Sequence, residues 1–175
     1  MVDRETLPYR DCVGTAIFNA EGLVFIGRRK KDDATPEDNS VLEAPWQMPQ
    51  GGIDKGEAAR DAAYRELFEE TSIRSVDLIA EAPDWIYYDL PDAALGIALK
   101  GKYRGQRQRW FAFLFTGAES EIDVLAPGGG AHPAEFDTWR WERLEALPDL
   151  IVPFKRDAYR QVVAAFRDLP ARIRG

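Results

Sequence analysis

Three glutamates in one short segment have the residue type and the spacing that metal-dependent chemistry needs. Glu66, Glu69 and Glu70 fall in a run rich in helix-forming residues, and positions three or four apart on a helix share one face. Like charges at this spacing destabilise an isolated helix by roughly 0.2–0.5 kcal/mol per pair. A helix that carries them therefore either faces water or holds cations. Arg65, four positions before Glu69, can reach and orient that carboxylate.

The candidate metal ligands in this segment are all carboxylate oxygens. The chain has one His and one Cys, so the expected ion is hard, Mg²⁺ or Mn²⁺ rather than structural Zn²⁺. Such ions neutralise phosphate oxygens and lower the pKa of a bound water so that it can attack. A glycine-rich stretch, 51–56, precedes the helix and lets the backbone come close to phosphates. Spacing alone leaves open the alternative of an acidic helix that only faces water.

Hydrophobic patterning indicates the elements that position these residues. Residues 57–71 lack Gly and Pro and are rich in Ala, Glu, Arg and Leu, which predicts a helix. Two apolar runs, 13–18 and 23–26, flank a turn sequence and predict a hairpin. Residues 154–169 carry apolar side chains three and four apart, which predicts an amphipathic helix ended by Pro170. Further strands are expected at 76–80, 85–90, 109–115 and 136–142, with 109–115 central and well buried.

The order of strands, helix, strands and helix predicts an α+β fold with packed layers. The 175 residues are expected to form one domain, 1–175, with a core over about 9–169. Residues 47–56 are expected to be a structured loop, and the polar stretch 32–45 a loop insertion. Pro127 and the three glycines after it predict a flexible loop.

The charge balance limits the classes of ligand. The chain has 23 basic and 30 acidic residues and a net charge of −7, so it is a poor nonspecific binder of nucleic acid. The basic residues are nevertheless unevenly distributed, and local basic patches suit a polyanion bound at one place, unless they are solvated faces. One run without acids holds Lys100, Lys102, Arg104, Arg107 and Arg109.

Several classes of protein are excluded or disfavoured. No run of 18 apolar residues predicts a membrane span, and the first residues do not resemble a signal peptide. The single cysteine, Cys12, is expected to be a small buried hydrophobe and fits a reducing cytoplasm. A single histidine, His132, disfavours a catalytic triad, and we assign it no role. Trp110, Trp139 and Trp141 are expected in the core or at its rim.

The stretch from Gly51 to Ile73 resembles the signature of the Nudix hydrolases. That signature is Gly, five residues, Glu, seven residues, Arg-Glu, an apolar residue, any residue, Glu-Glu, any residue, Gly and an apolar residue. The matching positions are Gly51, Glu57, Arg65, Glu66, Leu67, Glu69, Glu70 and Ile73. Ser72 departs from it, since the family usually has Gly there, and a Ser closes the helix at modest cost if its φ is negative.

The resemblance implies an α/β/α sandwich around a mixed sheet, with the signature as a loop-helix-loop motif. It implies hydrolysis of phosphoric anhydride bonds with Mg²⁺ or Mn²⁺ as the cofactor. The implied metal ligands are Glu66, Glu69 and Glu70 with Gly51 and Glu135, and the implied catalytic residues are these glutamates and Arg65. Glu135 is the additional acid near the ions, either a general base or a ligand. The alternative is that Glu135 is only a surface acid beside an aromatic strand.

Five further blocks, 46–52, 64–70, 105–111, 135–141 and 154–160, are similar to a Nudix subgroup of bacterial RNA pyrophosphohydrolases and diadenosine tetraphosphate hydrolases. The similarity runs from about Tyr9 to Phe166. It implies cytoplasmic hydrolysis of the 5′-triphosphate end of RNA to a 5′-monophosphate, which initiates mRNA decay. The alternatives are a dinucleoside polyphosphate hydrolase and a non-catalytic RNA-end sensor. Neither a membrane nor a stable protein partner is inferred.

The same resemblance implies two sets of substrate-binding residues. One set holds a nucleotide base near the RNA end by stacking and polar contact: Arg29, Val152, Phe154 and Lys155. The other set lines a phosphate channel: Tyr88, Gln106, Gln108 and Arg109. Phe154 has the alternative of being the first core residue of the last helix, and Arg109 that of a structural ion pair.

Overall fold

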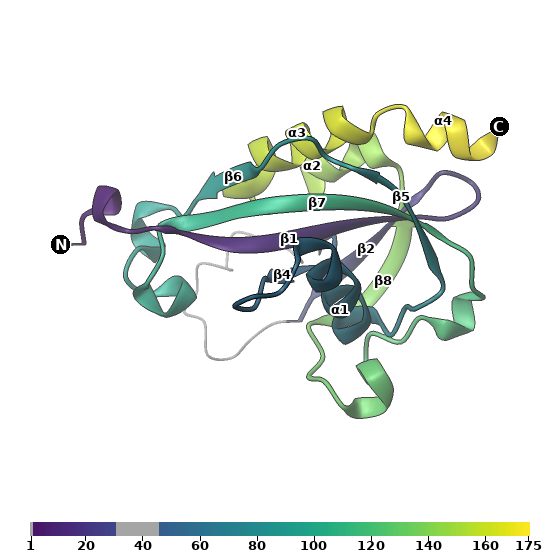
Figure 1. The fold of residues 1–175 in the computed structure, drawn as a ribbon, viewed down its shortest axis with the longest axis horizontal. Coiled ribbons are helices and arrows are strands. Elements are labelled where there is room, and N and C mark those ends of the chain that lie inside the picture. Colours follow the sequence, from purple (N-terminus) through teal and green to yellow (C-terminus); the bar gives the residue numbers. More distant parts are fainter. Residues whose placement is uncertain (1, 31–45) are drawn as a thin grey trace.

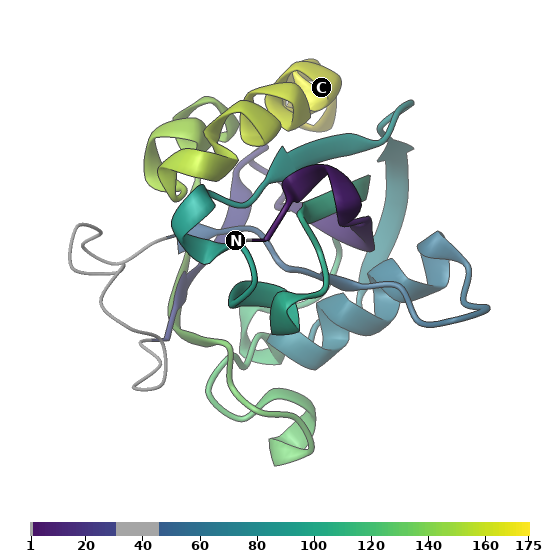
Figure 2. The same cartoon turned by 90° about the vertical axis from the view of Figure 1, so that its left-hand side faces the viewer.

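A mixed sheet of eight strands separates two helical layers (Figure 1). The computed structural model describes residues 2–30 and 46–175, so the expected loop insertion at 32–45 lies outside the described residues. Helix α1 (Ala59–Thr71) covers one face of the sheet, and α3 (Arg156–Phe166) covers the other, as the end view in Figure 2 makes clear. This arrangement confirms the α+β sandwich with a mixed sheet.

Most of the expected elements are present with shifted ends. Strand β7 begins at Gly105 rather than at Arg109. Residues 105–108 are Gly, Gln, Arg and Gln, so this first part of the strand has no hydrophobic pattern by which it could be predicted. No helix within the described ranges is long and apolar enough to cross a membrane. The strands are β1 (Tyr9–Phe18), β2 (Val24–Arg29), β3 (Trp46–Gln47), β4 (Gln50–Gly52), β5 (Val76–Glu81), β6 (Ile86–Asp89), β7 (Gly105–Phe115) and β8 (Phe136–Glu142). The other helices are α2 (Leu147–Leu150) and α4 (Leu169–Arg174).

Strands β1 and β7 form the centre of the sheet as a long parallel pair, in register from Tyr9 opposite Gly105 to Phe18 opposite Leu114. The other pairings are antiparallel, with β5 and β6 on the free edge of β7. Because β1 and β7 are far apart in sequence, their pairing brings the two ends of a long chain segment together. Helix α1 lies within that segment.

The first two strands diverge and make room for the loop that leads into α1. Strands β1 and β2 form the expected hairpin but pair only beside the turn, at Phe18 and Val24. Residues Cys12 to Gly14 of β1 pair instead with β4. Strand β2 turns away to pair with β3 and β8. The segment 46–52 fills the resulting gap, which fixes the glycine-rich loop against the sheet.

Each face of the sheet has its own hydrophobic core. On one face, Leu67 of α1 packs with Phe111 and Phe113 of β7. On the other, the Trp110 indole meets the Tyr159 ring of α3 edge-on, with centroids 5.8 Å apart. The sheet therefore positions α1 and α3 independently, one through odd-numbered and one through even-numbered residues of β7.

The cysteine and the tryptophans that were expected to be structural are packed in the core or at its rim. Cys12 is fully buried, and burial raises the pKa of its thiol to about 11, which leaves it a small hydrophobe. Trp139 and Trp141 lie on one side of β8 with ring centroids 5.6 Å apart, and both pack against Phe25. These observations confirm the core or rim positions expected for the tryptophans.

Two helix ends need comment. Ser72 closes α1 in the left-handed region, with φ of +66°, so the condition of a negative φ, under which a serine costs little, is not met. Pro170 does not end the last helix but opens α4, because a proline near a helix N-terminus removes no hydrogen bond that the helix needs. The break between α3 and α4 instead falls at Arg167 and Asp168.

The close approach of β1 to the Trp110 ring gives a test of the core. A Cβ added at Gly14 would lie 2.5 Å from ring carbons of Trp110. Gly14→Ala is therefore expected to lower the unfolding free energy by about 1–3 kcal/mol, measured by denaturant titration. Gly56→Ala, where the methyl meets nothing but φ is +79°, isolates backbone strain. Wild-type stability for Gly14→Ala would contradict this packing.

Candidate active site

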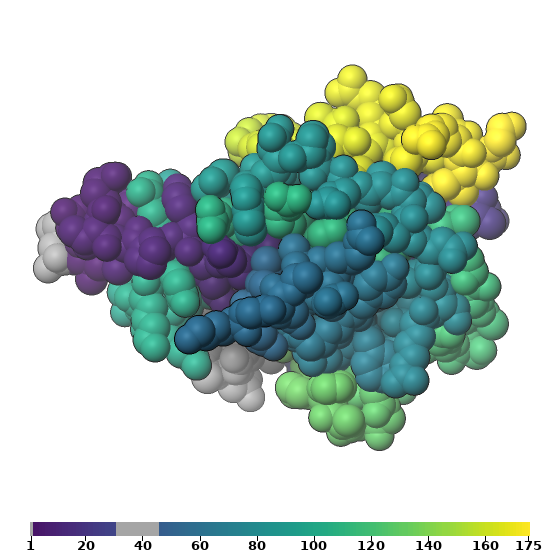
Figure 3. Space-filling model, viewed as in Figure 1, coloured from purple at the N-terminus to yellow at the C-terminus, as the bar shows by residue number. Residues whose placement is uncertain are grey.

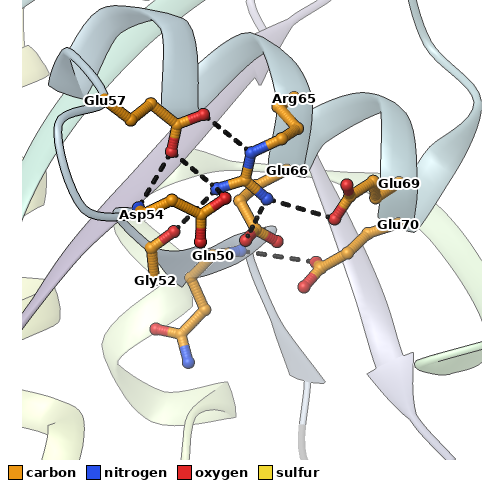
Figure 4. Close-up of polar contacts among 8 residues, drawn as sticks. All are labelled: Gln50, Gly52, Asp54, Glu57, Arg65, Glu66, Glu69 and Glu70. Carbon is orange, nitrogen blue, oxygen red and sulfur yellow. Dashed lines mark hydrogen bonds and ion pairs between the residues drawn. The ribbon is translucent and has the colours of Figure 1, made fainter.

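The acidic helix is connected to the glycine-rich loop through one arginine. Arg65 projects from α1 back over the loop, where Glu57 receives its Nε at 2.8 Å and its Nη2 at 2.8 Å (Figure 4). The same Nη2 donates to the Gly52 carbonyl at 2.9 Å. Its Nη1 donates to Glu66 at 2.9 Å and to Glu69 at 3.2 Å. These bonds use all five N–H donors of the guanidinium.

This arrangement confirms that Arg65 orients Glu69, and it adds contacts that spacing did not predict. The hydrogen bond from Arg65 lowers the pKa of Glu57 to about 2, so that carboxylate is ionised throughout the physiological range. The bonds to Glu57 and Glu66 raise the pKa of Arg65 itself. The arginine therefore fixes the loop, and also holds two of the three helix glutamates in defined rotamers.

The carboxylate of Glu66 lies directly against the glycine loop. A Cβ on Gly51 would overlap the Glu66 carboxylate, so a larger residue there would displace that carboxylate from the loop. Burial raises the pKa of Glu66, and the charge of Glu69 adds to that effect, whereas Arg65 opposes it. The Gly51 backbone and a partly desolvated carboxylate thus lie side by side.

Glu70 is the most buried of the three glutamates, with 7% of its surface exposed. Among the described residues, its carboxylate accepts one hydrogen bond, from the backbone amide of Gln50 at 3.3 Å (Figure 4). Burial raises its pKa well above the ordinary value, and the charges of Glu66 and Glu135 raise it further. An acid that is desolvated and faces other acids is costly unless a cation is bound nearby.

Glu135 reaches the neighbourhood of Glu70 from a distant part of the chain. It precedes β8, its side chain is exposed, and its charge acts on Glu70. Its backbone carbonyl accepts a hydrogen bond from the Lys30 amide at 2.9 Å, which ties this position to the end of β2. Two segments far apart in sequence therefore deliver acids to one site.

The donor set fits a hard divalent cation, since it consists of carboxylates with a backbone carbonyl at Gly51. Within 2–30 and 46–175, however, no three acidic, His or Cys side chains already form a coordination shell. The reason lies in the hydrogen bonds: Glu66 and Glu69 turn to Arg65, and Glu70 turns to Gln50. A cation would replace part of these interactions.

A relay of three glutamines runs from the core to this acidic site. The Trp110 indole, which can only donate, gives its N–H to Gln108 Oε1 at 3.0 Å. Gln108 Nε2 must then donate, and it does so to Gln106 at 3.0 Å and to Gln50 at 2.7 Å. Both side-chain oxygens thereby accept, so Gln50 and Gln106 keep their NH₂ groups as donors, and none of the described residues accepts a hydrogen bond from them. The relay gives this wall of the site the polarity that phosphate oxygens require.

An aromatic and cationic group lies beside the glutamines. Phe154 is 37% exposed and precedes α3, which excludes its alternative as a core residue of that helix. Its ring lies 5.8 Å from that of Tyr88, and Lys155 Nζ is 5.1 Å from the Tyr88 ring. Val152 is half-buried in the same segment and packs against the α3-side core. The exposed face of Phe154 is available for stacking.

Lys155 is the unusual member of this group, because only 6% of its surface is exposed. Burial lowers the pKa of its ammonium to about 7, and the nearby charge of Arg29 contributes. Arg29 ends β2 and is itself exposed. The pair forms a cationic spot across from Glu70, which acts on the pKa of Lys155 in the opposite direction.

Arg109 is the predicted site residue that the structure does not bring to this group. Side chains alternate along β7, so Gln106 and Gln108 face the relay whereas Arg109 faces the other side of the sheet. There it pairs with Glu81 at 2.5 Å and lies over the Trp85 ring. The alternative of a structural ion pair is therefore realised.

The two other arginines of the acid-free run are also paired with acids. Arg104 pairs with Asp89 at 3.1 Å, and Arg107 pairs with Asp11 at 2.6 Å. Acids from other strands thus neutralise the arginines that look unpaired in the sequence. The cationic group beside Glu70 consists instead of Arg29 and Lys155, which come from distant segments of the chain.

Sequence reasoning missed two residues of this site. The backbone amide of Gln50 binds Glu70, and the side chain of Gln50 forms the end of the glutamine relay. Arg10 lies opposite Gln106 in the β1–β7 pair, and its guanidinium fits against Gly52, where a Cβ would overlap it. No carboxylate within the described part of the chain lies within ion-pair distance of Arg10, although its charge acts on Glu66. The parallel register that places it there has no local signal.

Known proteins resemble this chain along most of its length. A family model described as "NUDIX domain" matches residues 8–162. An RNA pyrophosphohydrolase of Mesorhizobium japonicum is 62% identical over 169 residues, covering 96% of this chain and 95% of the relative. One of Rhodopseudomonas palustris is 57% identical over 173 residues, covering 99% of this chain and all (100%) of the relative.

Solved structures show the same fold at low identity. The dihydroneopterin triphosphate pyrophosphohydrolase of E. coli has a TM-score of 0.60 at 20% identity, covering 90% of this chain and 98% of that protein. The C. elegans Ap4A hydrolase, in a binary complex, has a TM-score of 0.58 at 16% identity, covering 89% and 96%. At these identities the likeness concerns the fold alone.

The five bonds of Arg65 give a direct test of the site. Arg65→Lys keeps the charge but has only three donors on one nitrogen, so the five bonds to Glu57, Glu66, Glu69 and Gly52 cannot all persist. We expect the unfolding free energy to fall by about 1–3 kcal/mol, measured by denaturant titration. Arg60→Lys, on the exposed side of the same helix, is the control. Equal stabilities for the two variants would contradict the role of Arg65.

Proposed function

This chain belongs to the NUDIX family of hydrolases, and on that premise we propose that it is an RNA pyrophosphohydrolase, which converts the 5′-triphosphate end of RNA to a 5′-monophosphate and so initiates mRNA decay. The observation that carries the proposal is the identity of 57–62% with three relatives of that name over nearly the whole length of both chains. The proposed substrate is present where transcription takes place, so cytoplasmic action is part of the proposal.

Nudix hydrolases use divalent metal ions, and Mg²⁺ or Mn²⁺ is the proposed choice. The proposed ligands are Glu66, Glu69 and Glu70 with the Gly51 carbonyl. The ion supplies charge neutralisation of the phosphate oxygens and lowers the pKa of a bound water. Support comes from the raised pKa values of Glu66 and Glu70: burial raises both, and the charges of neighbouring acids raise them further.

The four acids divide into three that are held and one that is free. Glu66 and Glu69 accept hydrogen bonds from Arg65, and Glu70 accepts one from Gln50. Glu135 is exposed, and no side-chain hydrogen bond engages it among the described residues. A carboxylate that is free and near the site is suited to accept a proton from the attacking water, and this is its proposed role.

The remaining residues are proposed to bind the two ends of the substrate. The NH₂ groups of Gln50 and Gln106, with Arg10, present donors to the phosphates. Phe154 stacks on a base, next to Tyr88 and Val152, and Lys155 with Arg29 binds the phosphate or base edge between them. Such an arrangement recognises the end of an RNA by its phosphates and an adjacent base, and it needs no large basic surface.

The test is release of label from RNA that carries a labelled γ-phosphate at its 5′ end. We expect release that requires Mg²⁺ or Mn²⁺ and is abolished by EDTA. Glu70→Gln is expected to lower kcat by at least about 100-fold, as loss of a charge that stabilises the reacting centre does. Glu21→Gln, in the exposed β1–β2 turn, is the control, and thermal unfolding checks that each variant folds.

Two results would overturn this proposal. Fast cleavage of diadenosine tetraphosphate at equal concentration, with no turnover of triphosphorylated RNA, would assign the site to dinucleoside polyphosphates. Tight binding of triphosphorylated RNA with no turnover of either compound would indicate an RNA-end sensor. Full activity of Glu70→Gln would contradict the proposed metal site.

The buried ammonium of Lys155 predicts opposite effects on binding and stability. With a folded pKa of about 7 against an ordinary 10.5, this lysine destabilises the free protein below pH 7, and the penalty fades as the pH rises toward 10.5. Lys155→Met is therefore expected to raise unfolding stability at about pH 6 and to do so less at about pH 10. It is also expected to raise KM for RNA about tenfold.

Denaturant titrations at the two pH values and steady-state kinetics check these effects. Lys102→Met, at an exposed lysine, is the control and should change neither quantity. A loss of stability at low pH for Lys155→Met, or an unchanged KM, would contradict the assignment of this residue to the substrate.

A further inference from the structure

Ser72 takes an unfavourable backbone conformation at the end of the catalytic helix. Its φ is +66°, in the left-handed region, and its amide closes α1 by donating to the Phe68 carbonyl at 2.9 Å. This conformation costs a non-glycine residue about 1–2 kcal/mol, and glycine adopts it freely. A serine here therefore needs a compensating interaction that a glycine cannot make.

The Ser72 hydroxyl supplies that interaction, because it binds two backbone groups of a distant loop. It donates to the Asp123 carbonyl at 3.1 Å and accepts the Gly128 amide at 2.9 Å. The Asp123 amide in turn donates to the Thr71 carbonyl at 2.9 Å. The end of α1 is thus hydrogen-bonded to the loop that follows β7.

A second set of bonds holds the start of the same loop. Glu121 accepts the amides of Arg74 and Ser75, each at 3.0 Å, and the Ser75 hydroxyl at 2.6 Å. The loop, 116–135, begins at the far end of β7 and projects below α1 in Figure 3. Although three consecutive glycines predicted flexibility, this part forms a 3₁₀ turn, Pro127–Gly130, against the helix.

The loop ends at Glu135, which is fixed to the opposite side of the site. Between Gly128 and Glu135 the chain passes His132, whose ring meets Phe68 of α1 edge-on with centroids 6.1 Å apart. The Glu135 carbonyl then accepts the Lys30 amide. The loop therefore spans from the C-terminal end of α1, two residues past Glu70, to the end of β2, as the ribbon in Figure 1 shows.

We propose that Ser72 is a positioning residue, whose hydroxyl docks the loop 116–135 on α1 and so fixes Glu135 relative to Glu70. The inference rests on the proposed function, since it assigns Ser72 a part in the reaction through Glu135. A residue that only ended the helix would be served better by glycine. The hydroxyl instead couples the two chain segments that supply acids to the site.

Two substitutions separate docking from helix termination. Ser72→Gly removes the hydroxyl and relieves the backbone strain, whereas Ser72→Ala removes the hydroxyl and keeps the strain. Both should undock the loop, while only Ser72→Ala should lower global stability. Ser120→Gly, at an exposed serine of the same loop with no side-chain bond in the described structure, is the control.

Amide hydrogen exchange measures how firmly the loop 116–135 is docked on α1, and it needs no assay of activity. We expect the amides of 124–131 to exchange at least about fivefold faster in both Ser72 variants, since loss of a single hydrogen bond of ~1 kcal/mol already produces that change. The amides of α1 should stay unchanged in Ser72→Gly, whose global stability is not expected to fall. Unchanged exchange in this loop would overturn the proposal. The exchange measurement still tests docking of the loop if the wild-type protein fails to hydrolyse RNA. In that case the proposed function is wrong, and the docking role of Ser72 is judged separately.

A double-mutant cycle with Glu135→Gln tests the catalytic consequence. In the wild-type background Glu135→Gln should lower kcat, and in the Ser72→Gly background it should lower kcat several-fold less, because Glu135 is already misplaced. Ser72→Gly alone should lower kcat and leave KM for RNA nearly unchanged. Additive effects of the two substitutions, or wild-type kcat for Ser72→Gly, would overturn the positioning role.

Discussion

The site depends on one guanidinium that keeps mutually repelling carboxylates together. Arg65 places its five donors on the glycine loop, on Glu57 and on two helix glutamates, and no donor is left over. Without this fork, Glu66 and Glu69 would repel each other on the same helix face. The position of the loop and the directions of the Glu66 and Glu69 carboxylates follow from it, and the Glu66 carboxylate in turn fills the space beside Gly51.

Opposite charges and dipoles lie on two walls that the sheet brings together. The acidic wall belongs to α1 and the residue before β8, and the donor wall belongs to β1, β7 and the start of the last helical segment. The donor wall takes its direction from Trp110, whose indole cannot accept a hydrogen bond and so orients Gln108. A core residue therefore sets the polarity of a surface that meets solvent. A substrate with bridged phosphates matches both walls, through a cation on one and amides on the other.

The sequence predicted what depends on local pattern. Helix α1 and its acids are encoded in consecutive residues, and the signature from Gly51 to Ile73 fixes their spacing. Strand alternation alone would have separated Arg109 from Gln106 and Gln108, since odd and even positions face opposite sides. The position of Arg10 could not be predicted from the sequence, because it depends on a parallel register with a strand from the other half of the chain. The conformation of Ser72 was out of reach for the same reason: its compensating partners, Asp123 and Gly128, lie 51 and 56 positions away.

The parallel pairing of β1 with β7 also sets the order in which the enzyme becomes competent during its own synthesis. Asp11 and Arg107, which pair across these strands, are 96 positions apart, and the whole of α1 is translated between them. A ribosome thus releases the acidic helix and its apolar face well before the strand that covers that face exists. Contacts of such long range form late and slowly. The nascent chain must keep Leu67 and its neighbours from aggregation until β7 emerges, and no catalytic centre is assembled on an unfinished chain.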